Sequence, residues 1–148
     1  MSSRLKINVS SAPRKGSVRF LRHGAGFGRC DEHFIVVLIP DCDRRHCVVI
    51  GVVTSQIEKR EEASRRNGFA PETVVRISPF EYAPLRVESA VDCNSVKKLE
   101  RAFFDSITAN AIPYADMPNA VVNRILEGVV KSDNVSESIK VLARSLLS

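Results

Sequence analysis

The sequence lacks the features that put a chain in or across a membrane. No run of apolar residues approaches the roughly 18 that span a bilayer. The opening stretch, MSSRLKINVSSAPRKGSVRF, also lacks the apolar centre of a secretory signal. Because residues 1–15 are polar and rich in serine and basic side chains, we expect a flexible arm followed by one domain, residues 16–148, in the cytoplasm.

Cysteine is scarce, and its spacing is irregular. The four thiols, at Cys30, Cys42, Cys47 and Cys93, form no regular framework, which argues against a fold held by disulfides. Cys42, His46 and Cys47 are close in sequence, and Cys30 could join them on a zinc ion. The adjacent His46 and Cys47, however, do not have the spacing of a zinc knuckle. We therefore predict neither a metal nor another cofactor.

The glycine-rich stretch RHGAGFGRC, residues 22–30, lacks the context of a nucleotide-binding loop. Glycines that cradle a phosphate follow a strand and precede a helix, whereas these precede HFIVVLI, which has strand composition. No lysine follows them, as it would in a P-loop. Two interpretations remain: a connector between strands, or a basic flap, carrying Arg22, His23 and Arg29, laid over a polyanion.

Charge is unevenly distributed along the chain. The net charge is +5, and the first fifty residues hold nine Lys/Arg against four Asp/Glu. Such a basic half attracts polyanions, RNA above all. A solvated surface, or the docking site of an acidic partner, would have the same composition.

Five stretches have the composition of β-strands. Alternating or continuous apolar and β-branched residues predict these strands, and the strand predicted at 85–96 is interrupted near Asp92 or Asn94. They are SVRFLR at 17–22, HFIVVLIP at 33–40 closed by Pro40, CVVIGVVTS at 47–55, ETVVRISPF at 72–80 and LRVESAVDCNSV at 85–96. The next stretch, KKLERAFFDSI at 97–107, fits either a helix or a closing strand.

Helical spacing follows the third strand and returns in the C-terminal third. Ser55 is a suitable N-cap for the first helix, and Gly68 follows its last helix-forming residue. Asp116 is the predicted N-cap of a helix over about 116–131, and Pro118 lies in its first turn. Ser136 is the predicted N-cap of a second helix, over about 136–147. We expect a mixed β/α fold, mainly β: a small, strongly bent sheet or open barrel with these C-terminal helices.

The order of these segments resembles that of the PemK/MazF-like toxin–antitoxin endoribonucleases. EHFIVVLI, VVIGVVTS, VVRISPF, RVESAVDC and MPNAVVNRILEGVV follow one another as the strands and closing helix of that family do, within residues 18–131. In that family a glycine-rich loop leads into the first long strand, and the second ends in a TS pair. The resemblance implies a small SH3-like barrel, a homodimer, and an acidic antitoxin as protein partner.

The resemblance also implies metal-independent cleavage of single-stranded RNA, in which the ribose 2′-OH attacks the adjacent phosphate. That step needs a base, an acid and a cation. The family relies on the threonine of the TS pair, here Thr54, and on an arginine followed by proline, where this chain has His33 and Phe34. Histidine exchanges protons but lacks the fixed charge of arginine. Either Arg29 or Arg22 then works with His33, or the module binds RNA or protein without cutting.

We therefore predict a catalytic group of residues and an RNA-binding group around it. The catalytic candidates are Thr54, His33 and Arg29, and the RNA-binding candidates are Arg19, Arg22, His23, Ser55 and Ser89. The hydroxyls also have structural explanations, since Thr54 and Ser55 suit a strand end and a helix cap. A protein whose C-terminal helices form an interaction surface is the third hypothesis.

Overall fold

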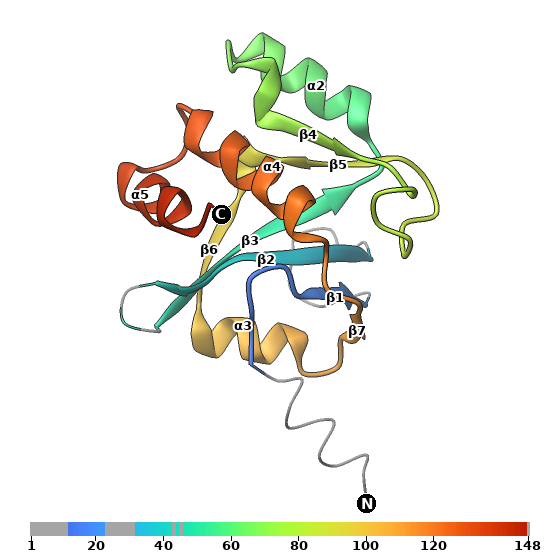
Figure 1. Ribbon diagram of the computed structural model, residues 1–148, viewed down its shortest axis with the longest axis vertical. Helices are drawn as coiled ribbons and strands as arrows, with labels where there is room; N and C mark the ends of the chain where they lie inside the picture. The colour runs from blue at the N-terminus through green and yellow to red at the C-terminus, as the bar shows by residue number, and fades with distance from the viewer. Residues whose placement is uncertain (1–11, 23–31, 43, 45, 148) are drawn as a thin grey trace, which may run out of the picture.

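A computed structural model describes residues 12–22, 32–42, 44 and 46–147 of the chain. In this part, seven strands form one antiparallel sheet with helices around it (Figure 1). The strands are β1 (Val18–Leu21), β2 (His33–Cys42), β3 (Cys47–Thr54), β4 (Val74–Ile77), β5 (Ser89–Asp92), β6 (Lys97–Glu100) and β7 (Ile112–Tyr114). The helices are α2 (Ile57–Arg66), α3 (Arg101–Thr108), α4 (Asn119–Lys131) and α5 (Glu137–Leu146), with short 3₁₀ helices η1 (Pro71–Thr73) and η2 (Cys93–Ser95).

The strand order is β4-β5-β3-β2-β1-β7, and β6 pairs with β3 as well. One edge of β3 is therefore shared: Cys47 to Ile50 pair with β6, whereas Val53 and Thr54 pair with β5. In the described residues the outer strands β4 and β7 do not pair with each other, so the sheet is not closed. The prediction of a mixed β/α fold that is mainly β is confirmed, and the structure adds that the sheet is antiparallel.

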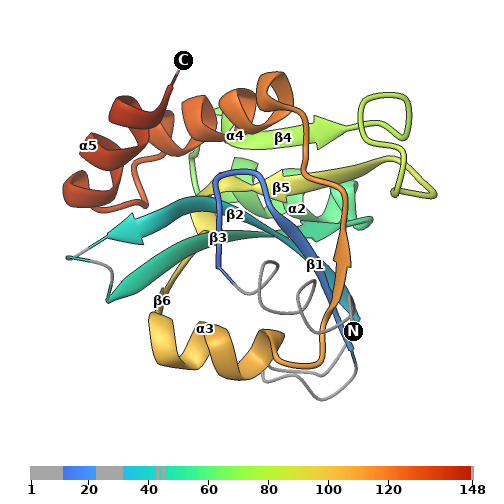
Figure 2. The same cartoon turned by 60° about the horizontal axis from the view of Figure 1, so that its bottom comes forward.

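Figure 2 shows α4 and α5 on one face of the sheet and α3 on the opposite face. β2 packs against the helices on both faces of the sheet, because alternate residues of a strand face opposite sides. Val36 and Leu38 belong to the larger core cluster, with α4, whereas Ile35 and Val37 pack with Phe104 of α3. Burial on both faces explains the continuous apolar run in this strand.

The C-terminal helices bury the faces that their sequences predict. Val121, Ile125 and Val129 of α4 are each at most 3% exposed, and Ile139 and Leu142 of α5 pack against the same cluster. This contact covers the sheet face that carries Val36 and Leu38. Within the described ranges, no helix is both long enough and apolar enough to cross a bilayer.

The start of α4 differs from the prediction. The helix begins at Asn119, and Pro118 is its N-cap. Asp116 is too far upstream to cap it, and its two carboxylate oxygens instead accept hydrogen bonds from Arg14 Nη2 at 2.8 and 3.0 Å. The predicted roles of Asp116 as N-cap and of Pro118 in the first turn are therefore wrong, because an ion pair to the N-terminal segment takes up the carboxylate.

The start of α2 also differs, whereas its end agrees with the prediction. Gln56, not Ser55, is the N-cap residue, and its backbone N–H donates to Thr54 Oγ1 at 3.1 Å. Gly68 follows the helix with φ of +75°, a left-handed conformation that suits glycine, and its N–H donates to the Arg65 carbonyl. Ser55 is exposed and leaves the helix without a side-chain cap.

Three strand predictions need correction. β2 does not end at Pro40 but continues to Cys42, and its pairing with β3 shifts register between Val37 and Ile39 and again between Ile39 and Cys42, where a proline is tolerated. Of the stretch 85–96, only Ser89–Asp92 form a strand, β5, and Cys93–Ser95 form the 3₁₀ helix η2. The stretch 97–107, for which the sequence left a helix and a strand open, contains both: β6 ends at Glu100 and α3 begins at the next residue. The short strand β7 was not expected from the sequence.

Candidate functional site

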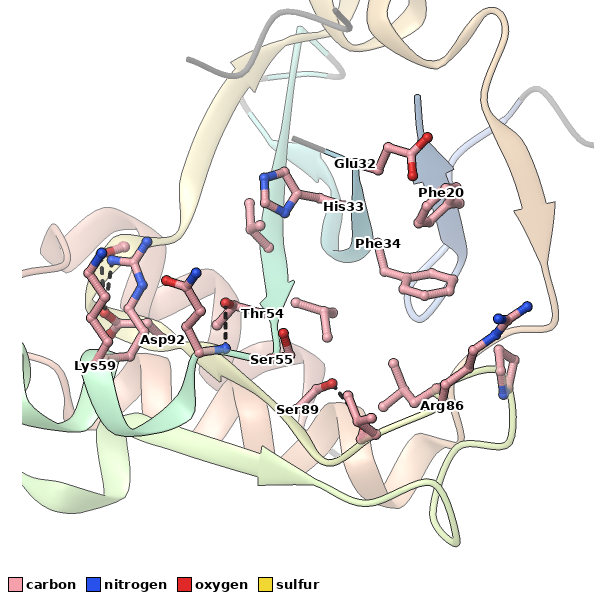
Figure 3. Close-up of a pocket in the computed structure, with 18 of the residues that line it drawn as sticks. Phe20, Glu32, His33, Phe34, Thr54, Ser55, Lys59, Arg86, Ser89 and Asp92 are labelled. Atoms are coloured by element: carbon pink, nitrogen blue, oxygen red, sulfur yellow. Dashed lines mark hydrogen bonds and ion pairs between the residues drawn. The ribbon is translucent and has the colours of Figure 1, made fainter. Parts of the chain in front are cut away.

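A wide cleft opens at the end of the sheet where β2 begins and β3 ends (Figure 3). Its volume is about 1360 Å³. Residues of β1, β2 and β7 line one side, and the start of α2, the two end residues of β5 and the segment 84–87 line the other. Side chains far apart in sequence therefore face one open space.

Three aromatic rings cluster on one side of the cleft. Phe20 and Phe34 are paired across β1 and β2, with ring centroids 4.9 Å apart in an edge-to-face arrangement. Tyr114 of β7 adds a third ring, 5.2 Å from Phe34 and 6.5 Å from Phe20. Tyr114 is 38% exposed, so this edge of the cluster is open to a ligand.

Basic side chains outnumber acidic ones in the lining of the cleft. The basic ones are Lys59, Arg60, Arg86 and Lys97, and the acidic ones are Glu32 and Asp92. Arg60 Nη1 lies 3.9 Å from Asp92 Oδ2, a weak ion pair. Arg86 is exposed and makes no ion pair with another described residue, so its charge is open to an anion.

His33 and Thr54 stand at the ends of two paired strands. The pairing of β2 with β3 ends at Phe34 and Val53, and His33 and Thr54 are the next residue of each strand beyond that pair. Both side chains line the cleft. Because Thr54 Oγ1 accepts from Gln56 N, its hydroxyl proton remains for a ligand.

The structure places half of the predicted site residues in this cleft. His33, Thr54, Ser55 and Ser89 line it, although Ser89 Oγ already donates to the Val87 carbonyl at 3.1 Å. His23 and Arg29 lie outside the described residues. The zinc interpretation has no structural support within the described ranges, where no three Cys, His, Asp or Glu side chains gather to hold a metal.

Arg19 and Arg22 do not line the cleft. Arg22 is exposed just beyond the end of β1. Arg19 is 9% exposed, and its Nη1 donates to the Val18 carbonyl at 3.0 Å. Burial lowers the pKa of Arg19, and the nearby charge of Arg14 adds to this effect. The RNA-binding role predicted for Arg19 therefore has no geometric support, because the strand turns its side chain into the protein.

Sequence reasoning missed Phe20, Tyr114, Lys59 and Arg86. Phe20 lies within the predicted strand 17–22, and the pairing of β1 with both β2 and β7 assembles the aromatic cluster. The one local signal was the sequence APLRV, where Arg86 interrupts an apolar stretch.

The segment that carries Arg86 is held firmly in place. The Glu81 carboxylate accepts hydrogen bonds from the Arg124 guanidinium and from Ser78 N, and these bonds lower the pKa of Glu81 to about 2. The Tyr82 hydroxyl donates to the Ala115 carbonyl, and burial raises the pKa of Tyr82 to about 12. Arg86 thus enters the cleft from an ordered support rather than from a loose loop.

Beneath the cleft, Asn94 joins three segments of the chain. Its Nδ2 donates to Thr73 Oγ1 at 2.8 Å and to Asp92 Oδ1 at 3.0 Å. Its Oδ1 accepts from Ser132 Oγ at 2.6 Å, and its backbone carbonyl accepts from Asn134 Nδ2 at 2.8 Å. Asn94 is only 5% exposed, so this network links Asp92 in the cleft to the turn between α4 and α5.

Replacing Asn94 with alanine is expected to lower the free energy of unfolding by about 2 kcal/mol, because buried hydrogen-bonding groups lose their partners. Urea denaturation measures this change. Asn110→Ala is the matched control, since Asn110 is an exposed asparagine outside this network and its effect should stay within about 0.5 kcal/mol. Equal stability of the two variants would contradict a structural role for the network.

Comparison of the sequence with protein-family models and with curated proteins finds no match in either set. The chemistry of the cleft therefore carries the functional argument.

Proposed function

We propose that this chain binds single-stranded RNA in the cleft. The observation that carries the proposal is the presence of three clustered aromatic rings and of basic side chains in one open cleft. Single-stranded RNA combines unstacked bases, which stack on aromatic rings, with phosphates, which basic side chains attract. A duplex keeps its bases paired, so single strands should bind more tightly.

Replacing Tyr114 with alanine is expected to weaken binding of a short single-stranded RNA by about tenfold, since stacking contributes about 1–3 kcal/mol per base. Fluorescence anisotropy with a labelled oligonucleotide measures this. Tyr114→Phe keeps the ring and should bind like the wild type. Affinity should also fall as salt rises, because phosphate contacts release counterions.

Phe103→Ala is the matched control for this experiment. Phe103 is an exposed aromatic residue of α3 that does not line the cleft, so its removal should leave RNA affinity unchanged. If Tyr114→Ala binds as tightly as the wild type, or if binding ignores salt, the cleft is not the RNA site.

A second activity, cleavage of the bound RNA, is favoured by the presence of His33 and Thr54, each next to the last β2–β3 pair, in the same cleft. We propose that the 2′-OH attacks the adjacent phosphate and displaces the 5′-oxygen of the next nucleotide. His33 takes the proton from the 2′-OH and gives it to the leaving 5′-oxygen, and Thr54 donates to a non-bridging phosphate oxygen. Arg86, which makes no ion pair with a described residue, is the candidate for the required cation. Cleavage in EDTA that leaves 2′,3′-cyclic phosphate ends supports this activity. Bound RNA that stays intact leaves a non-catalytic binding module.

The resemblance to toxin–antitoxin endoribonucleases extends this proposal to protein partners. A toxin of this type would form a homodimer and bind an acidic antitoxin that competes with RNA for the basic cleft. If an acidic protein encoded by the neighbouring gene displaces RNA from the cleft, this role is supported. If that protein does not displace RNA, the role is contradicted.

A further inference from the structure

Glu32 occupies an unexpected position for a carboxylate in a basic cleft. It directly precedes β2 and lines the cleft next to the aromatic cluster (Figure 3). It is two residues from Phe34, and alternate residues of an extended chain face the same side about 7 Å apart. Because Phe34 pairs with Phe20, Glu32 lies on the side of the strand that carries both rings.

The other cleft carboxylate, Asp92, already has partners. It accepts hydrogen bonds from Asn94 N and Nδ2 and from Ser95 Oγ, and it lies near Arg60. Glu32, in contrast, is exposed and makes no ion pair with another described residue. Its carboxylate is therefore open to a ligand bound on the rings.

The chemistry of a carboxylate restricts what that ligand can be. An ionised carboxylate only accepts hydrogen bonds and repels phosphate, so within an RNA site its partners are the donors of a base edge or a ribose 2′-OH, and of these only the base edge differs between nucleotides. Guanine presents two adjacent donors, N1–H and N2–H₂, that match its two oxygens. The corresponding edges of adenine, cytosine and uracil each place an acceptor beside their donor, which a carboxylate repels.

We propose that Glu32 selects guanine at the base position formed by Phe20, Phe34 and Tyr114, an inference that rests on the proposed binding of single-stranded RNA. One base stacks on the exposed part of the aromatic cluster, and its Watson–Crick edge meets the Glu32 carboxylate. Arg86 attracts the adjacent phosphate. Glu32 is then a specificity-determining residue: its carboxylate strengthens the binding of guanine and weakens the binding of the other three bases.

The test compares short uridine 2′-O-methyl oligonucleotides, which lack the attacking hydroxyl, each with one central guanosine, inosine, 7-deazaguanosine or adenosine. Wild-type protein should bind the guanosine and 7-deazaguanosine oligonucleotides about tenfold more tightly than the adenosine one, as a bidentate contact predicts. Inosine lacks the N2 amine and should bind with intermediate affinity.

Glu32→Gln should reduce the preference for guanosine to less than about twofold and should tighten binding of the adenosine oligonucleotide, because a negative charge is removed. A purely structural role for Glu32 would not produce opposite changes for two oligonucleotides. Glu127→Gln is the matched control: Glu127 is an exposed carboxylate of α4 outside the cleft, and its loss should preserve the preference.

A wild-type protein without guanosine preference, or a preference that survives in Glu32→Gln, would overturn this inference while the RNA-binding proposal stands. If the wild type binds none of the oligonucleotides and no unmodified RNA, the proposed function itself fails, and the inference fails with it.

Discussion

His33→Ala is expected to slow RNA cleavage by about 100-fold or more, because a positioned histidine that transfers a proton contributes roughly 10²–10⁴ to a rate. The effect should fall on turnover rather than on RNA affinity, since the aromatic cluster is left intact. Single-turnover cleavage of a labelled RNA in EDTA measures it. His46→Ala is the matched control, because His46 is exposed in the turn between β2 and β3, outside the cleft.

Thr54 provides the complementary measurement. Thr54→Val keeps the shape of the side chain but removes the hydroxyl, and the loss of one donor to a developing negative charge costs about 10²–10³ in rate. Thr54→Ser retains the hydroxyl and should retain most of the activity. If His33→Ala and Thr54→Val both cleave at the wild-type rate, the pair of residues has no part in catalysis.

Gly128→Val is expected to destabilise the protein by about 3 kcal/mol or more, because α4 approaches its neighbours too closely for a side chain. A Cβ at Gly128 would lie 2.6 Å from Cys93 Sγ, 3.1 Å from the Glu72 carbonyl oxygen and 3.2 Å from Val75 Cγ2. At this chain length such a change corresponds to a fall in melting temperature of about 10 °C. Thermal unfolding followed by circular dichroism measures it.

The close contact between Cys93 Sγ and position 128 can be tested separately. Cys93 is fully buried, and its Sγ donates to the Ile125 carbonyl at 3.3 Å. In a double-mutant cycle, Cys93→Ala should relieve part of the cost of Gly128→Ala, because the atom nearest to the new methyl group is removed. Ala120→Val, at an exposed position of α4, controls for the lower helix propensity of valine. Purely additive effects would show that this contact does not limit the approach of the helix.

Much of the fold follows from local patterns in the sequence. Continuous β-branched runs predicted the strands that are buried on both faces, and the spacing of Val121, Ile125 and Val129 predicted the buried side of α4. The strand β7 could not be predicted, because Ile112–Tyr114 contains a proline and forms a strand only through pairing with β1, more than ninety residues away. Tertiary context decided there against local propensity.

The candidate site likewise contains residues that the sequence pointed to and residues that only the structure reveals. The resemblance to the toxin family assigned roles to Thr54 and His33, which match positions of that family's motifs. It assigned none to Tyr114 and Arg86, since only the folded chain brings β7 and the segment before β5 to the end of β2. Arg19 is the opposite case: its charge suggested an RNA contact, but the sequence could not show that the fold buries its side chain.

The shared edge of β3 has a consequence for how the protein unfolds. β3 is paired with β2 along its length and with β5 and β6 at its two ends, so three strands lose a partner if it detaches. Val49 and Val53 of β3 belong to the larger core cluster and Val48 and Ile50 to the smaller one. Detachment of β3 would therefore expose both clusters, and we expect them to unfold together.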